Sequence, residues 1–334
     1  MNLIAIEEHW TTPRLTAALK DLPEGERDES LAFNEMGDNL ALLEDVGDAR
    51  IAVMDEQGID LSVLSVAPPA TGPLAAAGAL TLSRELNDLA AEAVSRHPSR
   101  LRAMATLPMA EPSAVAGELE RAAGLGLVGA MVYGRTGDTP LDHPCYDDLF
   151  ATAAALRLPV FIHPQIPTRA VREAAYSGFD DLTSLALSTF TWGWHLEAGL
   201  AALRLIARGT LDAHPDLQIV LGHWGELLPF WSERTDSLHR IAKLERKPSE
   251  YIRSNVHITC SGMLSPALLR HARDVTTPDR LLFSTDHPFL RPTSGEIQRF
   301  LTEIEDDAER AAFAAGNACR LFGIELPGTP DRAA

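Results

Sequence analysis

Acidic and imidazole side chains follow several short apolar runs of this sequence, and the first such pair lies near the N-terminus. Residues 3–6 are apolar and lead directly into Glu7 and His9, which are separated by one residue. A short apolar run is typical of a strand buried on both faces, as in a parallel sheet. Side chains alternate along a strand, so Glu7 and His9 point to one face and Glu8 to the other. A carboxylate and an imidazole side by side can hold a divalent metal ion, or they can form a buried ion pair.

Three later apolar runs also end in polar side chains, in the order His163, then His223 with Glu226 a turn later, then Asp286. Imidazoles and carboxylates without cysteine suit Zn2+, Mn2+ or Fe2+. A single histidine after a strand is more often a hydrogen-bonded structural residue. Four such positions that share one end of a sheet favour a metal site instead.

These side chains need a scaffold that gathers the strand ends, and the pattern of apolar runs predicts one. Eight short apolar runs alternate with helix-like segments, at residues 3–6, 59–66, 101–109, 127–133, 159–162, 217–221, 256–260 and 280–284. The alternation implies parallel strands joined by right-handed crossovers, and eight repeats predict an α/β fold of the (β/α)8 TIM-barrel type. A barrel brings the C-terminal ends of its strands to one face, where active sites lie.

The longest excursions follow the first and fifth runs, and we expect these inserted loops to form lids over the site. The chain lacks a GxGxxG after its first run and lacks GxxxxGK[ST], which excludes the main dinucleotide and P-loop sites. No internal repeat or low-complexity linker divides the sequence. We therefore predict one domain over residues 1–334, with a frayed polar tail at residues 327–334.

Composition narrows the classes of partner. The chain has 334 residues and a net charge of −18, from 47 acidic and 29 basic residues. Such an acidic protein is a poor candidate for binding nucleic acid or anionic membranes, and an anionic substrate would need a local cation from a metal or an arginine. The sequence shows neither a signal peptide nor a membrane span. Cys145, Cys260 and Cys319 are far apart, which predicts a reducing, cytoplasmic location.

The order and spacing of these motifs resemble a known family. The pattern consists of Glu7-x-His9, His163-Pro164, Gly222-His223-Trp224-Gly225-Glu226 and Ser284-Thr285-Asp286-His287-Pro288. It is similar to the amidohydrolase superfamily over nearly the whole chain. Within that superfamily it most resembles the non-oxidative, metal-dependent aromatic acid decarboxylases, such as the γ-resorcylate and 2,3-dihydroxybenzoate decarboxylases. The Glu-x-His start is closer to these enzymes than to aminocarboxymuconate semialdehyde decarboxylase.

The resemblance implies a metal site. It makes Glu7, His9, His163 and Asp286 the ligands of one divalent ion per chain, with Zn2+ as the first candidate and Mn2+ or Mg2+ as alternatives. Hydrolytic members of the superfamily often bridge two metals with a carboxylated lysine on the fourth strand. The run 127–133 contains no lysine, so we expect a mononuclear site.

The resemblance also implies a reaction, the non-oxidative decarboxylation of a hydroxylated benzoate. An ortho-hydroxybenzoate would chelate the metal, the ring carbon would take up a proton, and CO2 would leave. Asp286 is the first candidate for the proton donor although it is also a ligand, and His223 is the alternative. Glu226 would orient His223. Arg234 matches a substrate-binding arginine of the family in position.

Two other functions stay open at this stage. One is a metal-dependent hydrolase on the same scaffold, such as a lactonase or amidase, in which the metal activates water. The other is a non-catalytic barrel, which would hold no metal in the cluster. For the enzyme we expect a small aromatic carboxylate as substrate, no nucleic-acid or membrane partner, and a homodimer or homotetramer by analogy with relatives.

Several remaining polar and aromatic residues are predicted to be structural. We expect His195 to pack a loop, while Trp192 or Trp194 could wall the pocket. Trp10 and Phe289 could stack on an aromatic ring, or they could pack in the core. His287 would point away from Asp286, and Arg50 would form a structural ion pair. These assignments follow from residue type alone.

Overall fold

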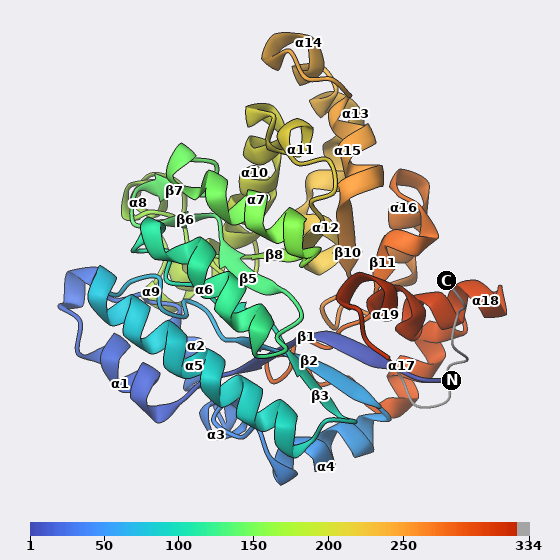
Figure 1. Ribbon diagram of the computed structural model, residues 1–334, viewed down its shortest axis with the longest axis horizontal. Coiled ribbons are helices and arrows are strands. Elements are labelled where there is room, and N and C mark those ends of the chain that lie inside the picture. The colour runs from blue at the N-terminus through green and yellow to red at the C-terminus, as the bar shows by residue number, and fades with distance from the viewer. Residues whose placement is uncertain (326–334) are drawn as a thin grey trace.

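Eight parallel strand positions make up the centre of the fold, and helices lie around them (Figure 1). This computed structural model describes residues 1–325, so the tail predicted at 327–334 lies outside the described residues. The strands are β1 (Ile4–Trp10), β2 (Leu61–Val66), β3 (Leu101–Ala103) with β4 (Ala105–Thr106), β5 (Ala130–Tyr133), β8 (Val160–His163), β9 (Ile219–Leu221), β10 (Val256–Thr259) and β11 (Leu281–Leu282). Each of the eight predicted apolar runs contains one of these positions.

The strands close into a barrel. They pair in parallel as β1-β2-β3 and as β11-β10-β9-β8-β5-β4. Two backbone hydrogen bonds join these groups: Met104 N donates to Leu64 O at 2.8 Å, and His9 N donates to His287 O at 2.8 Å. The second bond links the first strand to the segment after the last. The predicted (β/α)8 fold is confirmed.

Helices cover the outside of the barrel. The main ones are α4 (Asp48–Gln57), α5 (Ala76–Arg96), α6 (Pro112–Gly124), α7 (Asp147–Leu156), α10 (Gly193–Arg208), α15 (Pro248–Asn255), α16 (Pro266–Val275), α17 (Ser294–Leu301) and α19 (Asn317–Phe322). Their amphipathic faces pack on the strands and form the larger hydrophobic cluster. A second cluster fills the barrel interior, and α19 packs against it through Ala318 and Phe322.

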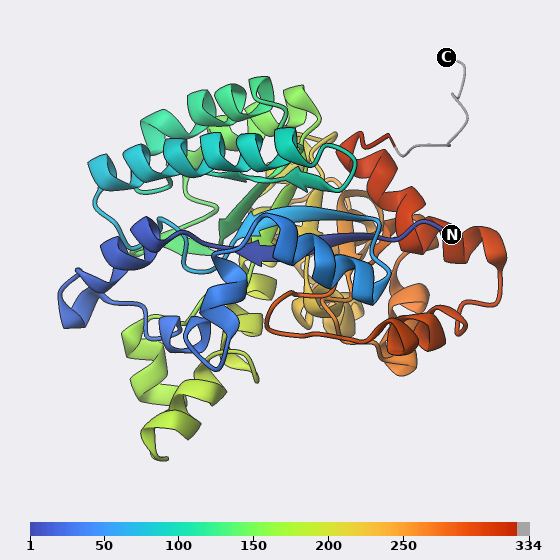
Figure 2. The ribbon, with the colours of Figure 1, turned by 90° about the horizontal axis from the view of Figure 1, so that it is seen from below.

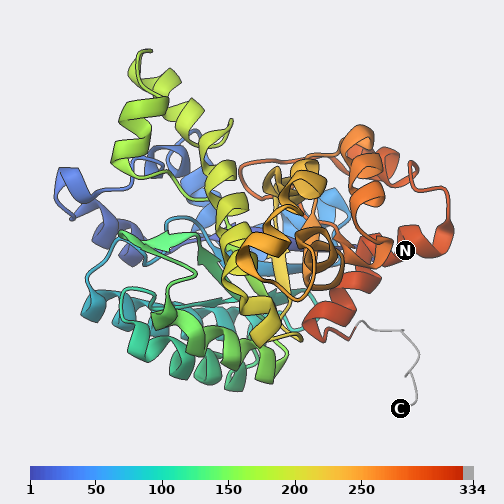
Figure 3. The same cartoon turned by 90° about the horizontal axis from the view of Figure 1, so that it is seen from above.

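Two inserts lie side by side at one end of the barrel, as Figures 2 and 3 show. The first follows β1 and contains α1 (Pro13–Lys20), α2 (Leu31–Asn34) and α3 (Asn39–Leu43). The second follows β8 and contains α8 (Arg169–Ala175) and α9 (Asp181–Ser188). Arg172 pairs with Glu29 at 2.5 Å, and the rings of Phe33 and Phe190 meet edge to face at 4.9 Å. The predicted inserts after strands one and five are present and contact each other.

Two helical segments of the barrel are interrupted. The approach to β2 is divided into α3 and α4, and α4 ends at Gly58, which adopts φ +76°. The segment after β9 is divided into η3 (Leu228–Trp231), α13 (Ser232–Thr235) and α14 (Leu238–Ala242). Pro229 and the left-handed residue Leu227 interrupt it, because neither is compatible with a continuing helix.

Among the described residues, no helix is long and apolar enough to cross a membrane.

Candidate metal centre and active-site cavity

A β-bulge in β1 aims the first two site residues. Between the pairs Ala5–Ser62 and Glu8–Leu64, β1 has two residues and β2 has only one. Before the bulge, Ile4 and Ile6 belong to the cluster that fills the barrel interior. Strict alternation would then send Glu7 and His9 to the opposite face, but the extra residue shifts the phase and turns them to the inside. Glu7 and His9 share one face as predicted, and the bulge turns that face toward the inside of the barrel.

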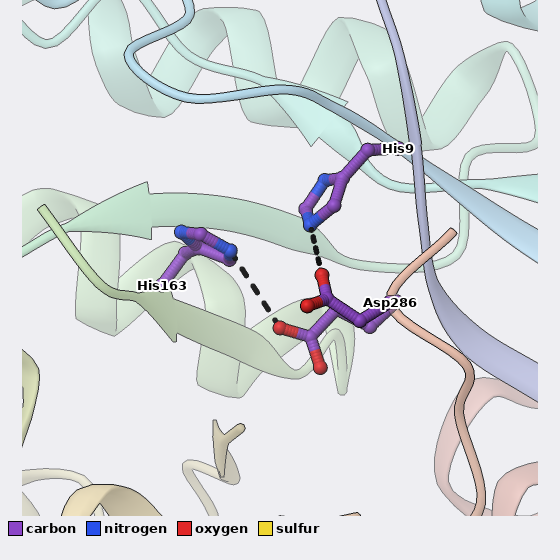
Figure 4. A group of neighbouring side chains, drawn as sticks. His9, His163 and Asp286 are labelled. Atoms are coloured by element: carbon purple, nitrogen blue, oxygen red, sulfur yellow. Dashed lines mark ion pairs between the residues drawn. The ribbon is translucent and has the colours of Figure 1, made fainter. Parts of the chain in front are cut away.

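The structure brings together Glu7, His9, His163 and Asp286. One potential ligand atom from each lies within 4.8 Å of all the others, and all four residues are buried. His9 Nε2 is 3.2 Å from Asp286 Oδ1, and His163 Nε2 is 3.6 Å from Glu7 Oε1. Figure 4 shows His9, His163 and Asp286 turned toward one another. This group has the size and composition of a mononuclear site for a divalent metal.

Two observations show that the group fits a metal ion. Glu7 Oε1 and His9 Nε2 are buried without a hydrogen-bond partner, although such atoms are normally satisfied. His163 Nδ1 lies 2.8 Å from the Pro164 carbonyl oxygen, which fixes the proton on Nδ1 and leaves the Nε2 lone pair facing the group. An ion at the centre would supply the missing partner for each of these atoms.

Burial sets the protonation of the centre when it holds no metal. It raises the pKa of Glu7 well above the usual range. It also lowers the pKa of His163 to about 3, helped by the nearby charges of His9 and His223. Burial alone would raise the pKa of Asp286, but the adjacent imidazoles of His223 and His9 hold that pKa below the usual range. The metal-free centre therefore favours neutral His163, Glu7 takes up a proton more readily than an exposed carboxyl group, and metal binding would compete with that proton.

Glu8, which points away from the centre, holds the last strand end in place. Its carboxylate accepts hydrogen bonds from Thr285 N at 2.9 Å and from Thr285 Oγ1 at 2.6 Å. Burial raises the pKa of Glu8 to about 7. Arg50, buried behind it, donates to the carbonyl oxygen of His9 at 2.5 Å. Together these contacts fix the position of Asp286, which follows Thr285 and has φ +60°.

A second cluster lies against the metal group. His223 Nδ1 is 2.8 Å from Glu226 Oε1, and His195 Nδ1 is 2.7 Å from Glu226 Oε2. His223 Nε2 is 3.6 Å from Asp286 Oδ2. Residues 223–227 all have positive φ, so the chain turns back and places Glu226 beneath His223. The result is a continuous chain of contacts from His195 through Glu226 and His223 to Asp286.

Within this second cluster, Glu226 and His223 strongly shift the pKa of each other. Burial alone would raise the pKa of Glu226, but His223 and His195 outweigh it and lower that pKa to about 2. Burial alone would lower the pKa of His223, but the carboxylates of Glu226, Asp286 and Glu7 raise it well above the usual range. His223 therefore holds a proton at neutral pH, next to Asp286.

His195 is the site residue that sequence reasoning missed. It was expected to pack a loop, but it bonds to Glu226 and lines the cavity together with Trp192 and Trp194. The imidazole adjoins Trp194, whose Nε1 donates to His195 Nε2 at 3.1 Å. No spacing rule links residue 195 to residue 226. One local signal was available: tryptophans flank this histidine at the start of α10, the helix that follows the second insert.

A cavity of about 600 Å3 opens above the two clusters. His163, His223 and Asp286 lie at its polar end. The walls come from both inserts and from the segments after β10 and β11, and they include Phe33, Met36, Phe190, Trp192, Met263, Phe289 and Leu290. A volume of this size suits a small-molecule ligand.

Of the other predicted residues, Phe289 lines the cavity, whereas Arg234, Trp10, His287 and Arg50 do not. Arg234, on α13, is exposed and does not line the cavity, so a substrate contact from within the same chain is not supported. Trp10 is 2% exposed and packs in the core, whereas Phe289 does line the cavity. His287 is buried but does not line it. Arg50 is structural, but in place of the expected ion pair its guanidinium donates to the carbonyl oxygens of Asp45, His9 and Leu42.

Comparison with known proteins connects this geometry with a family. The sequence profile of the family described as amidohydrolase matches residues 40–324. The chain is 34% identical to a γ-resorcylate decarboxylase of Rhizobium radiobacter over 336 aligned positions, covering 96% of this chain and 98% of that protein.

Solved structures give the same result. A 5-carboxyvanillate decarboxylase from Sphingomonas paucimobilis superposes with a TM-score of 0.87 at 32% identity, covering 97% of this chain and 99% of that one. A dihydroxybenzoic acid decarboxylase from Polaromonas, solved with bound manganese and the inhibitor 2-nitroresorcinol, gives 0.81 at 32% identity and 97% coverage of both chains.

Proposed function

This chain belongs to the amidohydrolase family, and on that premise we propose that it is a metal-dependent, non-oxidative decarboxylase of a hydroxylated benzoate. One observation carries the proposal: four buried carboxylate and imidazole ligands converge at the polar end of an aromatic-lined cavity, with a protonated histidine beside them. Relatives that match almost the whole chain are named decarboxylases of such acids.

The metal would be held by Glu7, His9, His163 and Asp286, as the sequence predicted. When bound, it supplies positive charge that neutralises and orients the carboxylate and ortho-hydroxyl oxygens of the substrate. The ligand types suit zinc and manganese alike. The manganese in the Polaromonas relative makes Mn2+ the first ion to test against Zn2+.

Glu226, His223 and Asp286 would carry out the proton transfer. Glu226 stays ionised and keeps His223 protonated and aimed at Asp286. The proton passes from His223 Nε2, directly or by way of Asp286, to the ring carbon that carries the carboxylate. The bond from that carbon to the carboxylate then breaks, its electron pair restores the aromatic ring, and CO2 leaves. His223 is reprotonated from solvent. The high pKa of His223 supports it, more than Asp286, as the store of the proton.

The test uses purified protein loaded with Mn2+ or Zn2+. Metal per chain is counted, and CO2 release is followed with 2,6-dihydroxybenzoate, 2,3-dihydroxybenzoate and 2-hydroxybenzoate. We expect one metal per chain and CO2 release that Asp286→Asn abolishes. Asp142→Asn is the matched control, because Asp142 is equally buried but pairs with Arg204 away from the site. One metal per chain with lactone opening and no CO2 would instead support a hydrolase.

We also propose that the protein forms a homo-oligomer in the cytoplasm. Phe230, Trp231 and Ile241 are 68%, 60% and 75% exposed on the segments after β9. Exposed apolar side chains gathered in one segment are typical of an interface. Light scattering should give a dimer or tetramer, and Trp231→Asp should shift it to smaller species. The three cysteines are unpaired, which supports a reducing compartment.

A further inference from the structure

Among residues 1–325, no arginine or lysine lines the cavity. Arg291 follows the lining residue Leu290 in sequence, but its guanidinium is paired with both carboxylate oxygens of Asp38, at 2.7 and 3.0 Å. The lining histidines belong to the metal group or to the Glu226 cluster. The walls of the cavity, as formed by the described residues, therefore offer no cation to a second carboxylate on the substrate.

Two neutral polar side chains of the wall, Asn39 and Thr191, already form hydrogen bonds within the protein. Asn39 Oδ1 accepts from Arg291 at 2.6 Å, and Asn39 Nδ2 donates to the Phe33 carbonyl oxygen at 3.0 Å. Thr191 Oγ1 donates to the Ala186 carbonyl oxygen at 2.7 Å. The hydroxyl hydrogen of Thr191 and one amide hydrogen of Asn39 are thus donated within the protein. A charged or strongly polar substituent placed beside them would lose water and find few donors in exchange.

The remaining wall is apolar and roomy. Phe33, Met36 and Trp192 come from the inserts, and Met263, Phe289 and Leu290 come from the opposite side. A volume of about 600 Å3 lies within the range of pockets for drug-sized ligands. A benzoate that carries only hydroxyl groups fills a part of it and leaves apolar wall uncovered.

From these observations we propose that the substrate is a 2-hydroxybenzoate with a single carboxylate and an apolar alkyl or aryl substituent elsewhere on its ring. This inference rests on the proposed function. The carboxylate and the 2-hydroxyl group lie at the metal centre, and the substituent packs against the apolar wall. Each methylene group that the wall buries raises kcat/KM by roughly fourfold, which corresponds to about 0.8 kcal/mol. A second carboxylate lowers it by roughly 100-fold, because that charge loses water without gaining a partner.

The experiment compares kcat/KM for CO2 release by the metal-loaded protein across one series. The series contains 2-hydroxybenzoate, its methyl, propyl and pentyl derivatives at each free ring position, and the derivatives that carry a second carboxylate. A separate binding measurement uses the phenols that decarboxylation would yield. Because Trp192 and Trp194 line the cavity, their fluorescence reports binding to metal-free protein without any turnover. Alkylphenols should bind more tightly than phenol in proportion to chain length.

A charge placed in the wall should reverse the preference. Phe190 lines the cavity and is 49% exposed, so Phe190→Arg adds a cation where the substituent would lie without disturbing the core. We expect it to remove the advantage of the alkyl derivatives and to raise kcat/KM for the dicarboxylates at least tenfold. Phe179→Arg is the matched control, because Phe179 is 61% exposed and lies outside the lining. It should change neither preference.

The outcomes separate the two proposals. A rise of kcat/KM and of phenol affinity with alkyl length, reversed by Phe190→Arg alone, supports the inference. CO2 release from 2-hydroxybenzoate with no gain from alkyl groups, or with dicarboxylates turned over equally well, overturns the inference and leaves the proposed function standing. No CO2 from any compound, by protein that holds one metal per chain, overturns the proposed function itself.

Discussion

Replacement of Glu226 by glutamine is the most informative single change, because this carboxylate is 1% exposed and serves two imidazoles at once. In Glu226→Gln the charge is lost. The amide can accept from only one histidine, and its NH2 group then faces the other ring. The variant therefore removes the stabilisation of two charged partners while it keeps the shape of the side chain.

The pKa of Glu226 gives the magnitude. Its pKa falls from 4.5 to about 2 in the folded protein. At about 1.4 kcal/mol per pKa unit, this is a contribution of about 3 kcal/mol to stability. A lowered carboxylate pKa stabilises fully above the unfolded value near 4.5, and the contribution disappears as the pH falls toward 2. By pH 3.5, about 1 kcal/mol of it is lost.

The assay is urea unfolding of metal-free protein at several pH values, with kcat measured separately on loaded protein. Glu226→Gln should be about 3 kcal/mol less stable at pH 7, and its difference from the wild type should shrink as the pH falls below 4.5. Because His223 loses the carboxylate that keeps it protonated, kcat should fall by roughly 100-fold.

Glu118→Gln is the control. Glu118 is also 1% exposed and accepts from Asn87 at 2.7 Å and from Arg121 at 2.8 Å, but it lies far from the cavity lining. Glu118→Gln should lower the free energy of unfolding while it leaves the metal content and kcat unchanged. A Glu226→Gln variant that loses less than about 1 kcal/mol at pH 7, or whose deficit is the same at pH 7 and pH 3.5, would refute the charge-sharing argument.

Three further outcomes are expected. Burial raises the pKa of Glu7, so metal binding competes with a proton on that carboxylate. The affinity for Mn2+, measured by calorimetric titration, should therefore weaken as the pH is lowered. An affinity that does not change with pH would contradict this. Gly222→Ala places a methyl group 3.0 Å from Glu7 Oε1 and Glu226 Oε1, so metal content and kcat should both drop while the melting temperature changes little. Arg50→Met leaves the carbonyl oxygens of His9 and Leu42 without their donor and should lower the free energy of unfolding by about 3 kcal/mol, whereas a loss under about 1 kcal/mol would show that water replaces it.

The barrel and its metal group could be predicted from sequence because their signals are local. A buried parallel strand needs a short apolar run, and each of the eight runs carries its own evidence. Glu7, His9, His163 and Asp286 were found because each follows such a run, and a barrel gathers its strand ends whatever the details of packing.

The rest was decided by contacts between distant parts of the chain. The bulge that turns Glu7 inward depends on how β1 pairs with β2, which the alternation of β1 alone does not reveal. His195 bonds to Glu226 across 31 positions, so no spacing rule could join them. Arg234 was placed at the site by resemblance alone, but it is exposed on α13 and does not line the cavity.

Sequence by itself thus determined the fold class and pointed to the candidate ligands, because the burial pattern of strands and the side chains at strand ends are both local properties of the sequence. The tertiary structure alone decided which imidazoles and carboxylates are hydrogen-bonded to each other, which arginines are already paired, and how apolar the cavity is. Those properties depend on hydrogen-bond partners and on desolvation, and both are set only when residues from the two inserts and from all sides of the barrel meet.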